Sequence, residues 1–389
     1  MSLLTSKIDE YIKNNYSRFH SPAHCGYLGL RDLSEVEGLD DLQDPKEVLK
    51  DVQEYIAQLF GASQSFMLVN GASIGMQASC LALKIYLDHH RMNKPVLVSR
   101  NIHKSTIAGI ILSGLDIEWI EPNWDEDLGL FTRIDFTGID WQKYSGLIIT
   151  NPSYEGFYST IPKLTIPIII DEAHGAHYKF HSCLPKPALE SGADIAVQSW
   201  HKTLGSLTQT GVLHVSHKSP ITPSLIKRCI NLLQTTSPSY LLLESISKTA
   251  EKFHIEGEAI LERCINFSNE IKIFKVANDD PTRLIIQVPS ISGHKLDSIL
   301  SQAKIALEEV QDNFVLANIN PGINSNDIQR LKSALDQIQQ DSDQALKKIP
   351  KPKSFFSNTN IRQAFFSDPD SQIIAPCPPG IALQIPGQL

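Results

Sequence analysis

The stretch Ile168-Ile169-Ile170-Asp171-Glu172-Ala173-His174 decides the fold of this chain, because an apolar run ends there on an acid. Such a run predicts a short buried strand whose last residue delivers a carboxylate to the edge of a sheet. A second run, residues 194–198, leads into Ser199-Trp200-His201-Lys202 and delivers an amine in the same way. We therefore expect Asp171 and Lys202 at the ends of two neighbouring strands.

A carboxylate and an amine at neighbouring strand ends are the pair that pyridoxal phosphate (PLP) chemistry requires. The lysine holds the aldehyde of the cofactor as a Schiff base, and the acid keeps the pyridine nitrogen protonated, which makes the ring an electron sink. The simpler alternative is that Lys202 is a solvated surface lysine after a strand. The apolar strand that precedes Lys202 favours the cofactor role.

Three motifs together resemble the ornithine/lysine/arginine decarboxylases of the aspartate-aminotransferase fold (fold type I). They are residues 171–177 (DEAHGAH), residues 198–209 around Lys202, and residues 99–105 (SRNIHKS). Shorter matches follow one another along the chain, at residues 39–42, 69–73, 235–240 and 378–381. As a set, from about residue 19 to the C-terminus, these matches are a strong signal.

Strand and helix patterns alternate between residues 45 and 240. Helical spacing occurs at residues 45–60, 73–87 and 104–112, and strand patterns occur at residues 66–69, 96–99, 118–120, 147–150, 168–171 and 194–198. This alternation predicts an α/β fold, a three-layer, mostly parallel sheet with helices on both faces. Ligands of such sheets bind at the carboxyl ends of the strands, where the motif residues lie.

The chain is expected to have three parts. An N-terminal segment, residues 1–44, contributes to the active site, residues 45–269 form the PLP-binding major domain, and residues 270–389 form a small α+β C-terminal domain. A long helical region at about 222–269 precedes shorter patterns at 283–288, 295–303, 314–319 and 327–338, and a loop is expected at 349–360.

Composition indicates an enzyme of the cytoplasm. The chain has 389 residues, of which 42% are hydrophobic, which is enough for one large core and a smaller domain. Its net charge of -8 argues against a nucleic-acid or anionic-membrane partner, and its apolar runs are too short to cross a bilayer. The six cysteines form no CxxC pair and no signal peptide is evident, so reduced thiols are expected.

The phosphate of the cofactor needs backbone N–H groups at the N-terminus of a helix. Gly71-Ala72-Ser73-Ile74 lies between a predicted strand and a predicted helix, and its small residues allow a close approach. The alternative is an ordinary helix cap at Ser73. The family resemblance favours the phosphate role.

The resemblance also implies the rest of the site. It implies that His103 stacks on the cofactor ring, that Ser199 and His201 approach the phosphate, and that Thr236 or Ser237 reaches the phosphate of a partner subunit, so a homodimer or higher homo-oligomer is expected. The predicted catalytic residues are Lys202, Asp171, His103, His174 and His201. The predicted cofactor-binding residues are Gly71, Ala72, Ser73, Ile74, His103, Asp171, Ala173, His174, Ser199, His201, Lys202, Thr236 and Ser237.

A metal site is the main competing interpretation of the histidines. His174, His177 and His181, with Asp171, have ligand chemistry that zinc accepts. The PLP family accounts for the first part of this run, so we expect no metal and structural roles for His177 and His181.

The expected activity is PLP-dependent decarboxylation of arginine, lysine or ornithine, in polyamine biosynthesis. The distal cation of the substrate has four candidate partners, Glu37, Asp40, Asp41 and Glu155. Two positions depart from the family: Cys25 stands where a lysine is usual, and Gln388 where a glutamate is usual. Two alternatives therefore stay open, an aminotransferase or other PLP-dependent lyase of the same fold, and a catalytically silent PLP-binding protein.

Overall fold

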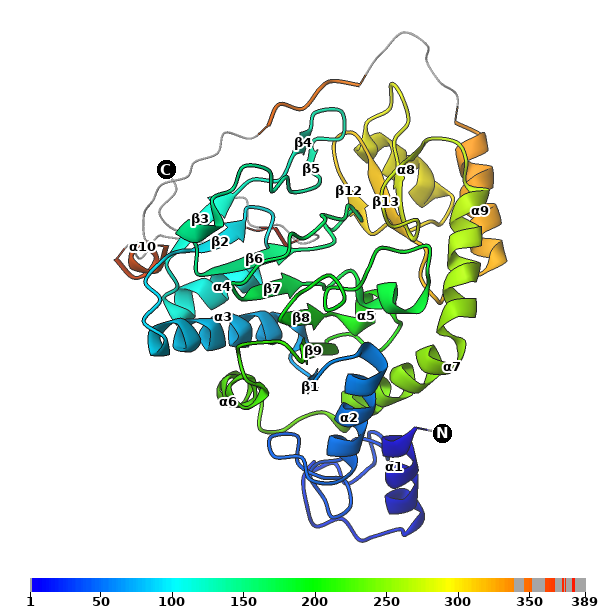
Figure 1. Ribbon diagram of the computed structural model, residues 1–389. Coiled ribbons are helices and arrows are strands. Elements are labelled where there is room, and N and C mark those ends of the chain that lie inside the picture. Colours follow the sequence, from blue (N-terminus) through cyan, green and yellow to red (C-terminus); the bar gives the residue numbers. More distant parts are fainter. Residues whose placement is uncertain are drawn as a thin grey trace.

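A seven-stranded sheet forms the centre of the molecule (Figure 1). The computed structural model describes residues 2–338, 346–351, 361–367, 373, 375, 380 and 381. In spatial order the strands are β1 (Gln64–Leu68), β9 (Gly211–Val215), β8 (Ile195–Gln198), β7 (Ile168–Asp171), β6 (Gly146–Thr150), β2 (Val96–Ser99) and β3 (Ile117–Ile120). Only β9 runs antiparallel to its neighbours, so the predicted mostly parallel α/β sheet is confirmed.

Helices cover both faces of this sheet. On one face, α3 (Gly71–His89), α4 (Lys104–Ser113) and α6 (Pro223–Leu233) pack over Ile169 and Val197. The other face carries α2 (Val48–Phe60), α5 (Trp200–Thr203), the 3-10 helix Ala176–Phe180 and α7 (Tyr240–Glu270). Helix α3 lies close to the sheet, since a Cβ atom on Gly75 would come within 2.6 Å of Val197.

A second, four-stranded antiparallel sheet follows α7. Its strands are β10 (Lys275–Val276), β11 (Arg283–Ile286), β13 (Val315–Asn318) and β12 (Glu309–Val310), and α8 (Gly293–Gln302) and α9 (Ser325–Asp336) accompany it. The remaining elements are α1 (Leu3–Lys13), the hairpin β4 (Trp124–Asp125) and β5 (Leu130–Phe131), the 3-10 helix Trp141–Lys143, and α10 (Ile361–Ser367). The division of the chain at residues 44 and 269 stays a prediction.

Several elements differ from the sequence expectation. Helix α1, strand β9 and the β4–β5 hairpin were not predicted, and most of the expected loop at 349–360 lies outside the described residues. Helix α2 begins at Val48 rather than at residue 45. The reason is Asp40, whose carboxylate accepts the backbone N–H groups of Lys46, Glu47 and Leu49 and so holds the chain that enters the helix.

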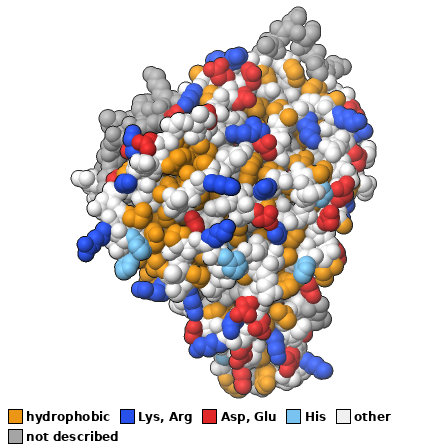
Figure 2. All heavy atoms as spheres, viewed as in Figure 1, with side chains coloured by type: hydrophobic (Ala, Val, Ile, Leu, Met, Phe, Trp, Pro, Cys, Tyr) orange, Lys and Arg blue, Asp and Glu red, His pale blue; other side chains and the backbone are white. Residues whose placement is uncertain are grey.

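The surface carries charges of both signs. Acidic and basic side chains are intermixed over the face seen in Figure 2. Among the described residues, no helix is long and apolar enough to span a membrane.

Candidate active site

The parallel order of β6, β7 and β8 brings the two predicted strand ends together. Asp171, the last residue of β7, pairs in register with Val197 of β8, and α5 with Lys202 begins two residues after β8 ends. The Asp171 carboxylate is buried and accepts the Ala173 N–H at 3.1 Å. Burial raises the pKa of Asp171, and the nearby Lys202 ammonium partly offsets this by lowering it.

Lys202 lies beside His174. Its Nζ atom is 3.0 Å from His174 Nε2. Burial lowers the pKa of His174 well below its usual value, and the positive charge of Lys202 lowers it further. A neutral His174 therefore accepts a hydrogen bond from Lys202 through Nε2. Its other ring nitrogen, Nδ1, is buried without a hydrogen-bond partner in the described part of the chain.

A buried polar network holds the strand that leads to Lys202. Gln198 donates from Nε2 to Glu172 at 2.7 Å, and its Oε1 accepts the indole N–H of Trp200 at 2.9 Å. The same oxygen lies 3.0 Å from Nε2 of His214, whose Nδ1 is 2.7 Å from Ser65 Oγ. Because Trp200 is the first residue of α5, this network fixes the helix turn that carries the lysine.

His103 caps α4 at the same edge of the sheet. Its Nδ1 accepts the Ser105 N–H at 3.1 Å, and the Lys104 N–H donates to the Gly380 carbonyl at 2.9 Å. Burial, followed by the charges of Lys202 and Lys104, lowers the pKa of His103 to about 4. A Cβ atom on Gly380 would lie 2.6 Å from His103 Nε2, so the C-terminal segment touches this ring directly.

The start of α3 fits a phosphate group. Gly71 has a φ of +77°, and Asn70 makes no side-chain cap, so the N–H groups of the first turn have no such partner. A Cβ atom on Gly211 would lie 3.0 Å from the Ala72 nitrogen, which explains why a glycine is needed beside this turn. Small residues and an uncapped helix N-terminus form a cradle that suits an anion.

The other predicted cofactor residues lie nearby or on the surface. Ser199 is buried at the N-cap of α5, and His201 Nδ1 lies 3.0 Å from the Thr210 carbonyl. Thr236 and Ser237 are exposed in the turn after α6, which is tied to the phosphate loop by the Thr235 N–H and Asn70 Oδ1 at 3.0 Å. With the buried carboxylate of Asp171 and the partly buried amine of Lys202, the residues present fit PLP.

Sequence reasoning missed three residues of this region. The Tyr154 ring lies 4.6 Å from the His174 ring, edge on, and its hydroxyl donates to Glu308. The Arg283 guanidinium lies over the same Tyr154 ring, 4.8 Å from its centroid. Arg283 and Glu308 come from the second sheet and its loops, so no local spacing in the sequence connects them with Lys202.

The remaining candidates are placed away from the lysine or are already paired. His177 Nε2 lies 3.0 Å from the buried Asp280 carboxylate, and His181 Nε2 lies 2.8 Å from Glu262. No group of acidic residues, histidines and cysteines in the described chain could hold a metal ion. Four residues were candidate partners of the distal cation. Asp40 instead accepts backbone N–H groups at the start of α2, and Glu37 and Asp41 are exposed. Glu155 is buried and accepts a hydrogen bond from Ser153 at 2.9 Å. Gln388 lies outside the described residues.

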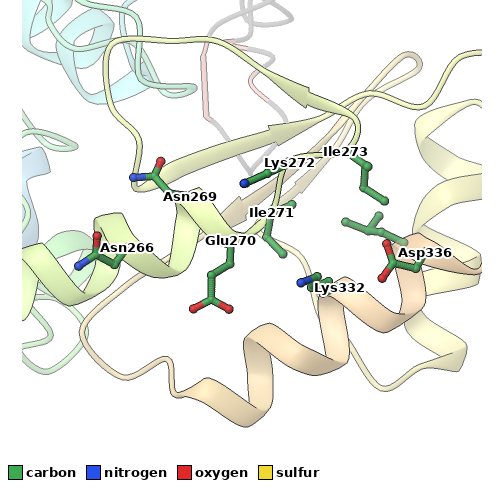
Figure 3. A pocket seen from close by; sticks show the side chains of 9 residues that line it. Asn266, Asn269, Glu270, Ile271, Lys272, Ile273, Lys332 and Asp336 are labelled. Carbon is green, nitrogen blue, oxygen red and sulfur yellow. The ribbon is translucent and has the colours of Figure 1, made fainter.

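A separate pocket is unrelated to this site. Figure 3 shows it between the C-terminal end of α7 and α9, where it has a volume of about 430 Å³. Its charged lining residues are Glu270, Lys272, Lys332 and Asp336, and none of them is a predicted site residue.

Comparison with known proteins agrees with this geometry. Residues 28–280 match the family described as "Orn/Lys/Arg decarboxylase, major domain". The chain is 31% identical to an arginine decarboxylase of Bacillus subtilis over 96% of its own length and 88% of that protein. It is 25% identical to the constitutive lysine decarboxylase of Escherichia coli, of which it covers 44%.

Solved structures show the same fold. A structure of the E. coli constitutive lysine decarboxylase has a TM-score of 0.79 at 19% identity, and the match covers 100% of this chain and 76% of that chain. A Francisella novicida lysine decarboxylase has a TM-score of 0.71, and 59% of that chain is covered. The matched family domain, the similar relatives and the shared fold show that this chain belongs to the Orn/Lys/Arg decarboxylase family of PLP-dependent enzymes, which decarboxylate basic amino acids.

Proposed function

We propose that this protein is an arginine decarboxylase, which converts arginine to agmatine and CO2. The observation that carries the proposal is the Lys202–His174 contact of 3.0 Å beside the buried Asp171 carboxylate. The choice of arginine is supported by relatives of similar length that are named arginine decarboxylases, from B. subtilis and Bacillus anthracis. In the sequence comparison, the match covers less than half of the length of the lysine decarboxylases from E. coli and Hafnia alvei. Lysine is the second candidate substrate, and ornithine the third.

We assign PLP to the edge of the sheet where β7 and β8 end. The proposed phosphate ligands are the first turn of α3, together with Ser199 and His201; the residues of that turn are Gly71, Ala72, Ser73 and Ile74. Asp171 would pair with the ring nitrogen, and Ala173 and His103 would contact the ring. When bound, PLP supplies an electron-poor ring that accepts the electron pair left on Cα as CO2 departs.

The protein groups around that ring control protons and orientation. Asp171 holds a proton at the ring nitrogen, because a buried carboxylate is stabilised by a cationic partner. The neutral His174 accepts a hydrogen bond from Lys202 Nζ through its Nε2 atom and so holds the amine in position. Lys202 or His201 then delivers a proton to Cα. His103 would contact the ring and help to hold its orientation, on which the choice of the bond broken at Cα would depend.

We propose that the working enzyme is at least a homodimer in the cytoplasm. In this proposal Thr236 or Ser237 completes the phosphate site of the partner subunit. The exposed position of this turn beside Asn70 leaves it accessible to a second subunit. We also propose that residues 1–44 are an N-terminal segment that contributes to the active site, that residues 45–269 form the PLP-binding major domain, and that residues 270–389 form the small C-terminal domain. Agmatine production would place the enzyme in polyamine biosynthesis.

Two other activities use the same residues. An aminotransferase or another PLP-dependent lyase would keep Asp171 and Lys202, and a silent protein would bind PLP without turnover. Cys25 motivates the silent alternative, since it is exposed and takes the place of a usual lysine. Neither alternative gains support from a specific contact in the structure that decarboxylation does not also use.

One assay separates these activities. Purified protein is incubated with carboxyl-labelled arginine, lysine and ornithine, with CO2 and keto acid measured in parallel. We expect CO2 from arginine first, visible absorbance from bound PLP, and loss of both in the Lys202→Ala variant. Keto acid without CO2 would support an aminotransferase, and bound PLP with neither product would support the silent protein. Wild type that binds no PLP would overturn the proposal as a whole.

A further inference from the structure

Any amino-acid substrate brings an α-carboxylate as well as an amine to Lys202. The two groups are bonded to the same carbon, so a cation that binds the carboxylate must lie beside the lysine. A narrow cavity of about 10 Å³, the size of one water molecule, has both Lys202 and Arg283 in its lining. Arg283, the first residue of β11, is only 3% exposed.

The guanidinium of Arg283 is held in a fixed orientation. Its Nε and Nη2 atoms donate to the Tyr154 carbonyl, the former at 2.9 Å, and its Nη1 atom donates to Asn318 Oδ1 at 2.5 Å. The group also lies over the Tyr154 ring. A guanidinium has five N–H bonds, and these contacts use three of them, which leaves one on each Nη atom.

A buried arginine ordinarily has an anionic partner. All three hydrogen bonds of Arg283 go to neutral acceptors, and no carboxylate in the described part of the chain lies within 4.0 Å of its guanidinium. Three buried acids of the neighbourhood have other contacts: Asp280 lies 3.0 Å from His177, Glu155 accepts from Ser153, and Glu309 accepts from Gln311. Burial raises the pKa of Glu155 and of Glu309, which favours their neutral forms. The site therefore has a desolvated cation with donors to spare, next to the reactive amine.

We propose that Arg283 binds the α-carboxylate of the substrate whose amine takes the place of the Lys202 amine. The inference rests on the proposed function and extends it to a second substrate-binding group. Two parallel N–H donors match the two oxygens of a carboxylate, and the low polarity of the surroundings strengthens the pair. The cavity admits the carboxylate when the side chain of Lys202, which now lines it, moves to its reacting position.

The ion pair acts on binding more than on the chemical step. The carboxylate is an anion in the bound substrate, but it leaves as neutral CO2 while the electron pair of the broken bond stays at Cα. Arg283 therefore stabilises the ground state more than the transition state. Its loss is expected to raise KM strongly and to leave kcat unchanged or higher.

The test compares arginine with agmatine, which has the same distal cation and amine but no carboxylate. Binding to the PLP-loaded enzyme is followed by the change in visible absorbance. We expect Arg283→Gln to weaken arginine binding by at least about tenfold, the range for a charge-assisted hydrogen bond, and agmatine binding by less than about twofold. A purely structural Arg283, which only holds Tyr154 and Asn318, predicts equal losses for both ligands.

A second measurement needs no variant. Wild-type enzyme is titrated with arginine and with argininamide, whose neutral amide replaces the carboxylate, and we expect argininamide to bind at least about tenfold more weakly. Equal affinities, or equal losses in Arg283→Gln, overturn the role of Arg283 while arginine decarboxylation stands. Wild type that neither binds nor decarboxylates any basic amino acid overturns the proposed function and this inference together.

Discussion

Replacement of Gln198 by leucine tests whether the buried network supports α5. The leucine removes three contacts at once, those to Glu172, Trp200 and His214, and it leaves their polar atoms buried. Each unsatisfied buried group costs about 1–3 kcal/mol, so the three together should lower the free energy of unfolding by about 3–9 kcal/mol. That is a large part of the roughly 5–15 kcal/mol that stabilises a typical domain.

Urea unfolding followed by circular dichroism measures this loss, with all proteins at one concentration. Gln58→Leu is the matched control, because Gln58 is exposed on α2 and its replacement should change the free energy of unfolding by no more than about 0.5 kcal/mol. We also expect Gln198→Leu to bind PLP more weakly, since Trp200 begins the helix turn of Lys202. A loss below about 1 kcal/mol with unchanged PLP affinity would refute the supporting role of the network.

Three further changes probe the edges of the site. In Gly380→Ala, the new Cβ would lie 2.6 Å from His103 Nε2 and displace the ring, so we expect kcat to fall at least about tenfold with little change in melting temperature; an unaltered kcat would contradict this. The folded state lowers the pKa of His103 to about 4, so the unfolded state binds more protons between pH 6.5 and 4, and His103 lowers stability as the pH falls through that window. The variant His103→Asn keeps a helix-capping side chain, and urea titrations should show that it loses less stability than wild type between pH 7 and 4.5. Equal losses in the two proteins would count against a buried neutral imidazole. Asp40→Ala removes the acceptor at the start of α2 and should lower the free energy of unfolding by about 1–2 kcal/mol without changing KM for arginine, whereas a raised KM would return Asp40 to the substrate site.

The strands of the site were predictable because their signals are local. The apolar runs that end at Asp171 and Gln198 are continuous, and β2 was predicted to the residue. Strand β9 was missed because His214 interrupts its apolar pattern. This histidine is fully buried, and only the folded chain supplies the Ser65 and Gln198 partners that make its burial tolerable.

Residues from distant parts of the chain could not be found in this way. Arg283 and Glu308 follow Asp171 by more than one hundred positions, and no periodicity connects them. In the sequence, Tyr154 is recognisable only as a tyrosine shortly after a predicted strand, and no pattern marks it as a site residue. Its role becomes visible when the fold places its ring between the Arg283 guanidinium and the His174 imidazole.

This arrangement links the second sheet to the candidate active site. Glu308 accepts the Tyr154 hydroxyl, and Arg283 donates to the Tyr154 carbonyl, so residues from the second sheet and its loops hold Tyr154, in the loop after β6, at two points. Tyr154 packs against His174, and His174 contacts Lys202. A shift of the second sheet would therefore displace Lys202 through Tyr154 and His174. The same shift would move Arg283, so under the proposed roles the carboxylate site and the Lys202–His174 contact would change together.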